Sequence, residues 1–398
     1  MTAAERWSSE VWPLDSPLRV TMLGIRGFPH VQGGAENHAQ HLSARLVELG
    51  CEVEVIVRSP YVPRNADRTW HNVRIVRVWS PRIKGVEVFL HTLLGVLRAA
   101  WTRPDVLHIH AIGPALFTPL ARAFGLRVVV THHVLNYENE KWGCVARSIL
   151  RLGERAGMLF ANGRIAVSEA LAHRMEHTYR VPVRAIPNGI GDPQTVQSTS
   201  TLTAFGLISK RYVLTVARID EQKRQLDLIE AFAQARQAPW KLAIVGGADY
   251  SSEFARAVTQ AAQKTPGVVM LGHQTGETLA QLYTHAGLFV LPSSHEGQPI
   301  AVLEAMSYGC PVVLSDIPAH REIGTSSAQF VRVGDVAALA DRLDAIFRTG
   351  RAPRLDADER ERLMQRHDWR QIARLTLGVY HAALSGRRRS ARCDPLRT

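Results

Sequence analysis

Two successive series of short apolar runs, separated by helical patterns, limit the folds that this chain of 398 residues can adopt. The first run, Leu18 to Gly24, is followed by a glycine-rich loop, a helical pattern from Ala35 to Leu49, and a second run at Val53 to Val57. This is the order of a βαβ unit with parallel strands. Further strands are expected at residues 73–78, 106–110, 128–131, 163–167 and 183–186. The alternation predicts a doubly wound α/β sheet that binds ligands at the carboxyl ends of its strands.

The alternation stops at Asn188 to Pro193 and in the polar stretch from Gln194 to Thr203, which is typical of an interdomain linker. It then restarts, with strands expected at residues 212–216, 242–245, 268–271, 288–291, 312–314 and 329–331 and helices near 358–365 and 369–384. The simplest architecture is two Rossmann-like, doubly wound domains, residues 1–190 and 191–370, that face each other across a central cleft. A helix at 371–386 and a basic, disordered tail at 387–398 are expected to complete the chain.

The net charge of +12 is unevenly distributed. Residues 1–190 hold 23 Lys and Arg against 15 Asp and Glu, whereas residues 191–386 hold 20 of each. This asymmetry predicts an anionic partner, lipid surface or nucleic acid at the first domain, and a merely solubilising surface explains it equally well. The four cysteines lie far apart and suggest neither a disulfide nor a zinc site. Without a signal peptide or an apolar run of about 18 residues, the chain is expected to stay in the cytoplasm.

The stretch SSHEGQPIAVLEAMSYGCP, from Ser293 to Pro311, carries two carboxylates at what looks like the entry to a helix. Pro299 suits the first helical position, which leaves Glu296 in the preceding loop and Glu304 about a turn and a half inside the helix. Gly297 leaves the helix-start amides uncovered. Together these groups could bind a ligand that has both phosphates and hydroxyls. The alternative is an acidic helix N-terminus that only complements the helix dipole.

A second cluster, VARIDEQKR, follows the first strand of the second domain. Arg218 and Lys223 lie there at the carboxyl end of the strand, where a guanidinium and an ammonium could bind a diphosphate. The alternative is a pair of solvated loop charges. The single D-x-D triplet, Asp356 to Asp358, reads as acidic residues at a helix N-terminus and not as a metal site.

Three features of the first domain are candidates for ligand contacts. His110 ends a predicted strand, on the same face as His108, which is read as buried structure. Gly33 and Gly34 end a loop at a helix N-terminus, with a spacing unlike the GxGxxG dinucleotide fingerprint. The loop THHVLNYENEKWG supplies the acceptor-side candidates, which are His132, His133, Asn136 and Lys141.

In combination these motifs resemble glycosyltransferase family 4, the retaining GT-B enzymes, over about residues 18–384. EGQPIAVLEAMSYGCPVV is similar to the family's E-x7-E region, ARIDEQKR to its diphosphate clamp and QGGAE to its glycine loop. HHVLNYENEKWG resembles the bacterial members that build surface polysaccharides. EGQP stands where EGFG is commoner in the family.

The resemblance implies a role for each candidate. Glu304 would bind the donor's ribose, Glu296 would touch the transferred sugar, and His110 would reach that sugar from the first domain. Arg218 and Lys223 would neutralise the departing diphosphate. The other donor contacts implied are Gly33, Gly34, Gly272, His273, Gln274, Gly297, Gln298, Pro299, Ile300 and Ala301. The domain of residues 1–190 would take the acceptor, and the helix at 371–386 would pack back on it.

The expected activity is a metal-independent, retaining transfer of a hexose from a nucleoside-diphosphate sugar, without a resident cofactor. The acceptor would be a hydroxyl of a saccharide or of a polyprenyl-diphosphate-linked saccharide in cell-surface polysaccharide assembly. The helix at 86–101 is read mainly as packing on the sheet, with peripheral contact to an anionic membrane as the minor reading. Three alternatives fit the sequence less well. The glycine fingerprint of an NAD-dependent enzyme is missing, and so is any recognised nucleic-acid-binding module. A catalytically silent GT-B protein would not need Arg218, Glu296 and Glu304.

Overall fold

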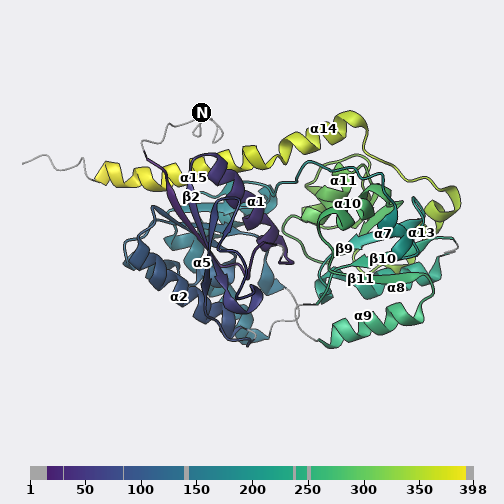
Figure 1. The fold of residues 1–398 in the computed structure, drawn as a ribbon, viewed down its shortest axis with the longest axis horizontal. Helices are drawn as coiled ribbons and strands as arrows, with labels where there is room; N and C mark the ends of the chain where they lie inside the picture. The colour runs from purple at the N-terminus through teal and green to yellow at the C-terminus, as the bar shows by residue number, and fades with distance from the viewer. Residues whose placement is uncertain are drawn as a thin grey trace, which may run out of the picture. The chain divides into compact units, whose positions relative to one another are not determined.

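The computed structural model describes residues 16–29, 31–83, 85–138, 143–235, 239–248 and 252–390. The chain forms two compact units (Figure 1). Unit 1 comprises Met1–Gly189 and Trp369–Thr398, and unit 2 comprises Ile190–Asp368. Among the described residues, no helix is long and apolar enough to cross a bilayer.

Unit 1 is built on an eight-stranded sheet in the order β3-β4-β2-β1-β5-β6-β7-β8, parallel except for β3. Its strands are β1 (Arg19–Leu23), β2 (Glu52–Arg58), β3 (Thr69–Trp70), β4 (Val73–Val78), β5 (Val106–His110), β6 (Val128–His132), β7 (Gly163–Ala166) and β8 (Arg184–Ala185). The strand order reverses between β1 and β5. Ligands of doubly wound sheets bind at such a switch point, outside the carboxyl ends of the strands.

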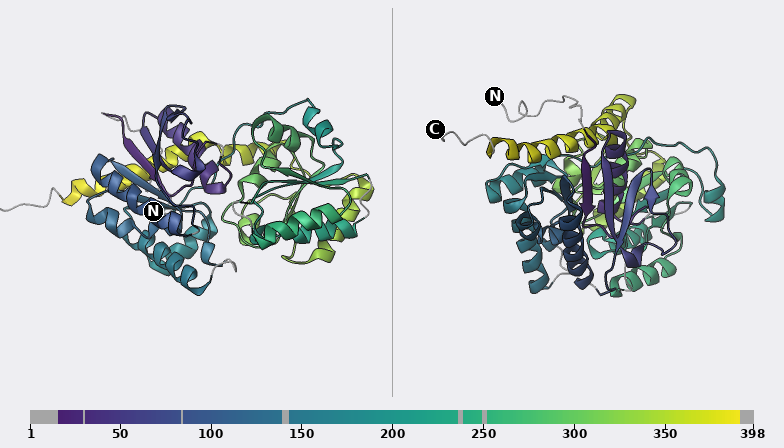
Figure 2. Two further views of the ribbon diagram at one scale, coloured as in Figure 1. Left: turned by 60° about the horizontal axis from the view of Figure 1, so that its bottom comes forward. Right: turned by 60° about the vertical axis from the view of Figure 1, so that its left-hand side comes forward.

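Helices cover both faces of this sheet (Figure 2). α1 (Gly34–Glu48) and α15 (Trp369–Ser390) pack on one face, and their apolar residues share a core with Val20, Met22 and Val55. The other face carries α2 (Val86–Thr102), α3 (Ile112–Ala115), α4 (Thr118–Ala123), α5 (Cys144–Phe160) and α6 (Glu169–Tyr179). Short 3-10 helices occur at η2 (Ser59–Tyr61) and η3 (Asn136–Glu138).

Unit 2 has a six-stranded parallel sheet in the order β11-β10-β9-β12-β13-β14, which reverses between β9 and β12. Its strands are β9 (Tyr212–Val216), β10 (Lys241–Val245), β11 (Val268–Gly272), β12 (Leu288–Leu291), β13 (Val312–Ser315) and β14 (Gln329–Val331). One face packs against α7 (Ser200–Ala204), α10 (Gly276–His285), α11 (Ile300–Ser307) and α14 (Ala357–Arg366). The other packs against α8 (Gln225–Gln234), α9 (Glu253–Lys264) and α13 (Val336–Thr349). The remaining helices are η4 (Glu221–Lys223) and α12 (Pro318–Arg321).

Several expected boundaries differ from the structure. Pro299 is the N-cap of α11, with φ −80° and ψ 101°, and the helix proper begins at Ile300. Proline's fixed φ fits both positions, so its extended ψ decides between them. α15 begins at Trp369 and continues to Ser390, so residues 387–390 are helical instead of disordered. Arginine is a good helix former, which explains the extension. The end of the expected tail, residues 391–398, lies outside the described residues.

Candidate functional site

The switch point of unit 2 brings the two predicted charge clusters together. Lys223 lies in η4, after β9, and Glu296 lies in the loop after β12, the neighbouring strand. The Lys223 Nζ donates to Glu296 Oε1 at 2.5 Å, and both side chains are largely buried. The backbone supports the pair, because the amide of Ser294 donates to the Gln222 carbonyl at 2.8 Å. Residues 73 positions apart in sequence therefore form one site at the carboxyl edge of the sheet.

Lys223 determines the charge state of Glu296. Burial by itself would raise the pKa of this carboxyl, but the adjacent Lys223 ammonium outweighs burial and the pKa of Glu296 lies below its ordinary value. His320, a buried residue of α12, is also close enough to favour the carboxylate form. Glu296 is thus an anion at neutral pH, suited to accept hydrogen bonds from hydroxyls.

The start of α11 lies beside this pair and offers backbone donors. The amides of Val302 and Leu303 donate to the Pro299 carbonyl at 3.1 and 3.4 Å. The first amides of a helix, here those of Ile300 and Ala301, have no intrahelical acceptor and suit an anionic ligand. Pro299, one of the predicted donor contacts, has no N–H, so it caps the helix and cannot donate a hydrogen bond. Gly297 and Gln298 supply the other two amides among the predicted contacts from Gly297 to Ala301.

Glu304 lies on the second turn of α11, and a buried tyrosine holds it in place. The Tyr283 Oη donates to Glu304 Oε2 at 2.9 Å, and the Tyr283 ring stacks on Tyr308 with centroids 5.5 Å apart. Burial, and then the Glu304 charge, raises the pKa of Tyr283 well above its ordinary value, so the phenol keeps its proton and remains a donor. Tyr283 positions Glu304, which the sequence patterns did not reveal.

The other donor-side candidates lie at the same edge of the sheet. Arg218 follows β9 and is half-buried, and its carbonyl accepts a hydrogen bond from the buried Gln225 Nε2 at 2.8 Å. Gly272 ends β11 with a positive φ of 64°. His273 is exposed, whereas the Gln274 side chain turns back to the Leu271 carbonyl, with Nε2 at 2.6 Å. Gln225 fixes the backbone of Arg218 and is a further residue that sequence reasoning missed.

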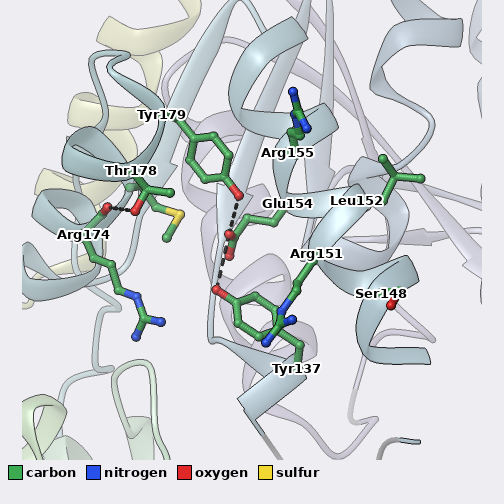
Figure 3. Close-up of a pocket in the computed structure, with 10 residues that line it drawn as sticks. Tyr137, Ser148, Arg151, Leu152, Glu154, Arg155, Arg174, Thr178 and Tyr179 are labelled. Atoms are coloured by element: carbon green, nitrogen blue, oxygen red, sulfur yellow. Dashed lines mark hydrogen bonds between the residues drawn. The ribbon is translucent and has the colours of Figure 1, made fainter. Parts of the chain in front are cut away.

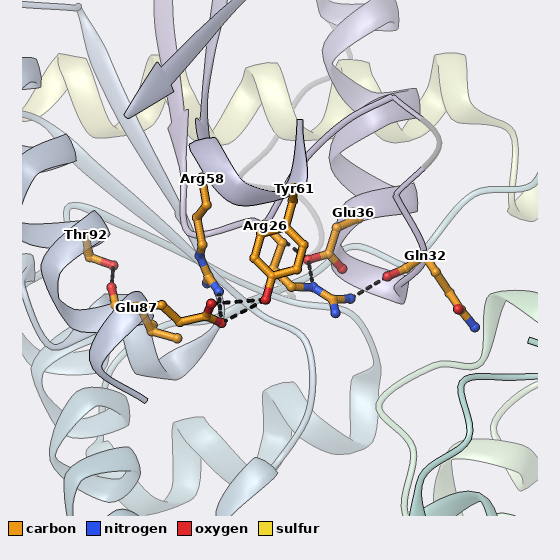
Figure 4. Close-up of polar contacts among 8 residues, drawn as sticks. Arg26, Gln32, Glu36, Arg58, Tyr61, Glu87 and Thr92 are labelled. Carbon is orange, nitrogen blue, oxygen red and sulfur yellow. Dashed lines mark hydrogen bonds and ion pairs between the residues drawn. The ribbon is translucent and has the colours of Figure 1, made fainter. Parts of the chain in front are cut away.

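In unit 1, the glycine loop after β1 is fixed by a buried ion network (Figure 4). Arg26 pairs with Glu36 at 3.0 Å, and Arg58 pairs with Glu87 at 2.9 Å. A Cβ at Gly33 would lie 2.0 Å from Glu36 Oε2, whereas a Cβ at Gly34 would meet no atom within 4 Å. Packing therefore explains Gly33, and Gly34 presents an open position at the first residue of α1.

His110 lies at the end of β5, inside a cluster of neutral imidazoles. Its Nδ1 is 3.2 Å from His133 Nε2, and its buried Nε2 has no partner among the described residues. His108 is bonded on both sides, to Tyr380 at 2.7 Å and Thr131 at 2.6 Å, which confirms that it is buried structure. His38 of α1, which the sequence patterns missed, contacts the rings of both His110 and His133.

Burial keeps this histidine cluster uncharged. It lowers the pKa of His38 to about 4 and that of His108 to about 3. For His110 and His133, burial and then neighbouring histidines lower the pKa well below the ordinary value. At neutral pH, His110 therefore offers a neutral ring nitrogen, able to donate or accept one hydrogen bond, at the switch point of unit 1.

The acceptor-side candidates do not all lie together. His132 is fully buried, and its Nε2 lies 2.8 Å from Glu154 Oε2. His132 ends β6 and contacts α5, whereas His133 joins the cluster of His110 and His38, so the two histidines do not lie together. A role for His132 on the acceptor side stays a prediction. The backbone of Asn136 lies in η3, and its side chain is not among those described. Lys141 lies outside the described residues.

The described part of the chain holds no group of three or more His, Cys, Asp or Glu side chains arranged to bind a metal ion. Asp356 of the D-x-D triplet caps α14 by accepting a hydrogen bond from the Glu359 amide at 2.7 Å. This confirms its reading as a helix N-terminal residue.

Comparisons with protein families and with curated proteins show which proteins this two-unit α/β chain resembles. A family model described as "Glycosyltransferase Family 4" matches residues 32–192, and one described as "Glycosyl transferases group 1" matches residues 210–349. The alpha-maltose-1-phosphate synthase of Mycobacterium tuberculosis is 29% identical, over 91% of this chain and 99% of that protein. The GDP-mannose:cellobiosyl-diphosphopolyprenol alpha-mannosyltransferase of Xanthomonas campestris is 33% identical, over 40% of this chain and 43% of that protein.

Among solved structures, the sucrose-phosphate synthase of Thermosynechococcus elongatus superposes with a TM-score of 0.79 at 21% identity, over 93% of this chain and all of that one. The two family models together match well over half of the chain. The chain belongs to glycosyltransferase family 4 and has the GT-B fold. It is a glycosyltransferase that uses a nucleotide sugar.

Proposed function

We propose that the chain transfers a hexose, with retention at the anomeric carbon, from a nucleoside-diphosphate sugar held at the switch point of unit 2. The observation that carries this proposal is the meeting of Lys223 and Glu296 at 2.5 Å beside the amides of α11. Cations and amides suit a diphosphate, and carboxylates suit the hydroxyls of ribose and sugar. In this assignment Glu304 binds the ribose, Glu296 the sugar, and Arg218 with Lys223 the diphosphate.

In the proposed reaction, the bond from the anomeric carbon to the diphosphate oxygen breaks on the face where the acceptor oxygen attacks. The proton of the acceptor hydroxyl passes to the leaving phosphate oxygen. Arg218 and Lys223 stabilise the charge that develops on the diphosphate, which is the role a metal ion plays elsewhere. The transfer is therefore expected to be metal-independent and to need no resident cofactor.

NMR of the product tests retention, and an inverted anomeric centre contradicts it. Loss of activity in EDTA that added Mg²⁺ or Mn²⁺ restores contradicts metal independence.

For the acceptor, we propose a saccharide carried on a polyprenyl diphosphate at the inner face of the cell membrane, in surface-polysaccharide assembly. The excess of basic residues in 1–190 supports an anionic acceptor. The Xanthomonas relative, whose name specifies a cellobiosyl-diphosphopolyprenol, supports the same class. Transfer to a synthetic prenyl-diphosphate disaccharide should exceed transfer to the free disaccharide, and equal rates for both would contradict the proposal.

The donor is best identified by thermal shift. A ligand that binds the folded state alone raises the melting temperature by mass action. A panel of UDP, GDP, ADP and dTDP sugars should give one clear stabiliser. NAD serves as the negative control for the alternative two-domain enzyme, and stabilisation by NAD alone would contradict the proposed donor site.

A further inference from the structure

α2 packs on the sheet as expected, through residues such as Val96 and Ala99, and the outer surfaces of α2 and α5 are apolar as well. The polar residues Glu87 and His91 of α2 are buried, and apolar side chains lie outside. Trp101 is 89% exposed and Val145 75% exposed. We call this surface the α2–α5 face, made up of Val86, Phe89, Leu94, Leu97, Trp101, Val145, Ile149, Leu152, Leu159 and Phe160.

The two helices contribute to one surface. Both lie on the side of the unit 1 sheet away from α15 (Figure 2), and α3 contacts both of them. A Cβ at Gly113 of α3 would lie 3.8 Å from Val88 of α2 and 3.7 Å from Leu150 of α5. α2 follows β4 and α5 follows β6, so both helices begin at the carboxyl edge of the sheet, where His110 lies.

On α2 and α5 the carboxylates are buried, and the exposed charges of α5 are positive. Each helix has a single carboxylate, Glu87 or Glu154, and both are buried. Glu87 is bonded to Arg58 at 2.9 Å and Glu154 to His132 at 2.8 Å. Neither helix therefore presents an acid on its outer surface. The exposed charges of α5 are arginines, and no described carboxylate forms an ion pair with Arg151 or Arg155.

A cavity of about 460 Å³ lies beside the apolar side chains of α5, between α5, α6 and η3 (Figure 3). Arg151, Arg155, Arg174 and Leu152 line it. Arg151 lies over the Tyr137 ring, 5.3 Å from its centroid. Among the described residues that line it, Glu154 is the only carboxylate, and it accepts from Tyr179 Oη at 2.7 Å and Tyr137 Oη at 3.3 Å. Arg174 is paired with Glu138 at 2.5 Å, so Arg151 and Arg155 give the mouth of the cavity its positive charge, next to an apolar surface.

We propose that the α2–α5 face docks on a bilayer that contains anionic phospholipids. An amphipathic surface with aromatic and aliphatic side chains, arginines and no acids fits the boundary between headgroups and acyl chains. Arg151 and Arg155 lie at the cavity beside the apolar side chains, where lipid phosphates would contact them. A second copy of the chain fits less well, because a twofold interface would place the arginines of both copies in one patch to which neither α2 nor α5 contributes an exposed carboxylate. The inference rests on the proposed function only in placing unit 1 where a lipid-linked acceptor would be.

Vesicle co-sedimentation of the full chain, without donor or acceptor, tests the docking. The wild type should bind vesicles of phosphatidylcholine with phosphatidylglycerol, more weakly at high salt, and bind pure phosphatidylcholine less well. The variants Leu97→Glu/Ile149→Glu and Arg151→Glu/Arg155→Glu should each lower the partition coefficient at least about tenfold. Trp101→Ser, at a nearly fully exposed position, should lower it with little risk to folding. Ile208→Glu, at a 57% exposed position of unit 2, is the matched control and should bind as the wild type does.

Three results overturn the docking: no binding of the wild type, an equal loss in the Ile208→Glu control, or a dimer in solution that Leu97→Glu/Ile149→Glu dissolves while vesicles are not bound. Each variant is first checked for an unchanged melting temperature and for stabilisation by the donor nucleotide. Transfer to a water-soluble acceptor should be unchanged in these variants. If the wild type transfers no sugar to any acceptor, the proposed function is contradicted. The vesicle result does not depend on transfer and would still test the docking.

Discussion

Lys223 carries a charge with two consequences, one for the fold and one for the reaction. In Lys223→Met, Glu296 stays buried without a counter-ion, and the free energy of unfolding should fall by about 3 kcal/mol. In Lys223→Met/Glu296→Gln the unpaired charge is gone, so most of that stability should return. Transfer should remain at least about 100-fold slower, because the diphosphate has lost a cation. Urea denaturation and transfer rates measure the two effects, and a double variant that is as active as the wild type would contradict the assignment.

Gly33 and Gly34 should respond differently to alanine. Gly33→Ala forces a Cβ against the Glu36 carboxylate and should destabilise unit 1. Gly34→Ala meets open space and takes a helical position, so the melting temperature should be unchanged or slightly higher. If a diphosphate lies over Gly34, the added methyl should slow transfer by about 100-fold. A Gly34→Ala variant with normal activity would remove this residue from the donor site.

At the scale of elements, the Arg58–Glu87 pair anchors α2 to the sheet. Glu87→Gln leaves the Arg58 guanidinium buried with a neutral partner, and the Tyr61 hydroxyl also loses its carboxylate acceptor. The free energy of unfolding should fall by about 3 kcal/mol. Glu48→Gln, at an exposed ion pair on α1, is the matched control and should cost less than about 1 kcal/mol. Equal losses for the two variants in urea denaturation would contradict the anchoring role.

Local pattern predicted most strands, because buried parallel strands appear as apolar runs such as Val106 to His110. It missed β3, which is only two residues long. It did not show that the polar residues Glu87 and His91 of α2 turn inward, where Glu87 meets Arg58 of β2. A partner this distant in sequence does not appear in the periodicity of the helix itself.

In the candidate site, too, the local sequence pattern predicted some residues, and contacts between distant residues revealed the others. The rule that ligands bind at strand ends was enough to predict that Lys223 and Glu296 would both lie at the ligand-binding edge of one sheet. Their direct contact follows from the neighbouring positions of β9 and β12, which the sequence pattern did not give. The supporting residues, Tyr283, Gln225 and His38, lie on helices away from any motif, and only their contacts reveal them. The contact of His132 with Glu154 was not predicted either, because Glu154 lies on α5, 22 residues later.

At the scale of the whole molecule, stability should depend on pH through the buried histidines. Their pKa values in the fold, about 4 for His38 and about 3 for His108, lie below that of an unfolded histidine. The unfolded chain therefore binds more protons as pH falls below about 6.5, and the free energy of unfolding decreases. At pH 5 each of these histidines should cost about 2 kcal/mol relative to pH 7.

Urea denaturation at pH 7, 6 and 5 measures this dependence. His173→Asn, which changes a histidine whose side chain is 76% exposed, should leave the slope with pH unchanged. A stability that is constant from pH 7 to pH 5 would contradict the neutral, buried state of the histidine cluster.

Donor binding by Glu304→Ala and Glu296→Ala, measured by calorimetry beside the rate of transfer, tests the central assignment most directly. Because Glu304 is assigned to the ribose and Glu296 to the sugar, Glu304→Ala should weaken donor affinity by about tenfold or more, and Glu296→Ala should mainly lower the turnover number. Unchanged donor affinity in Glu304→Ala would contradict the placement of the nucleotide sugar at the switch point of unit 2.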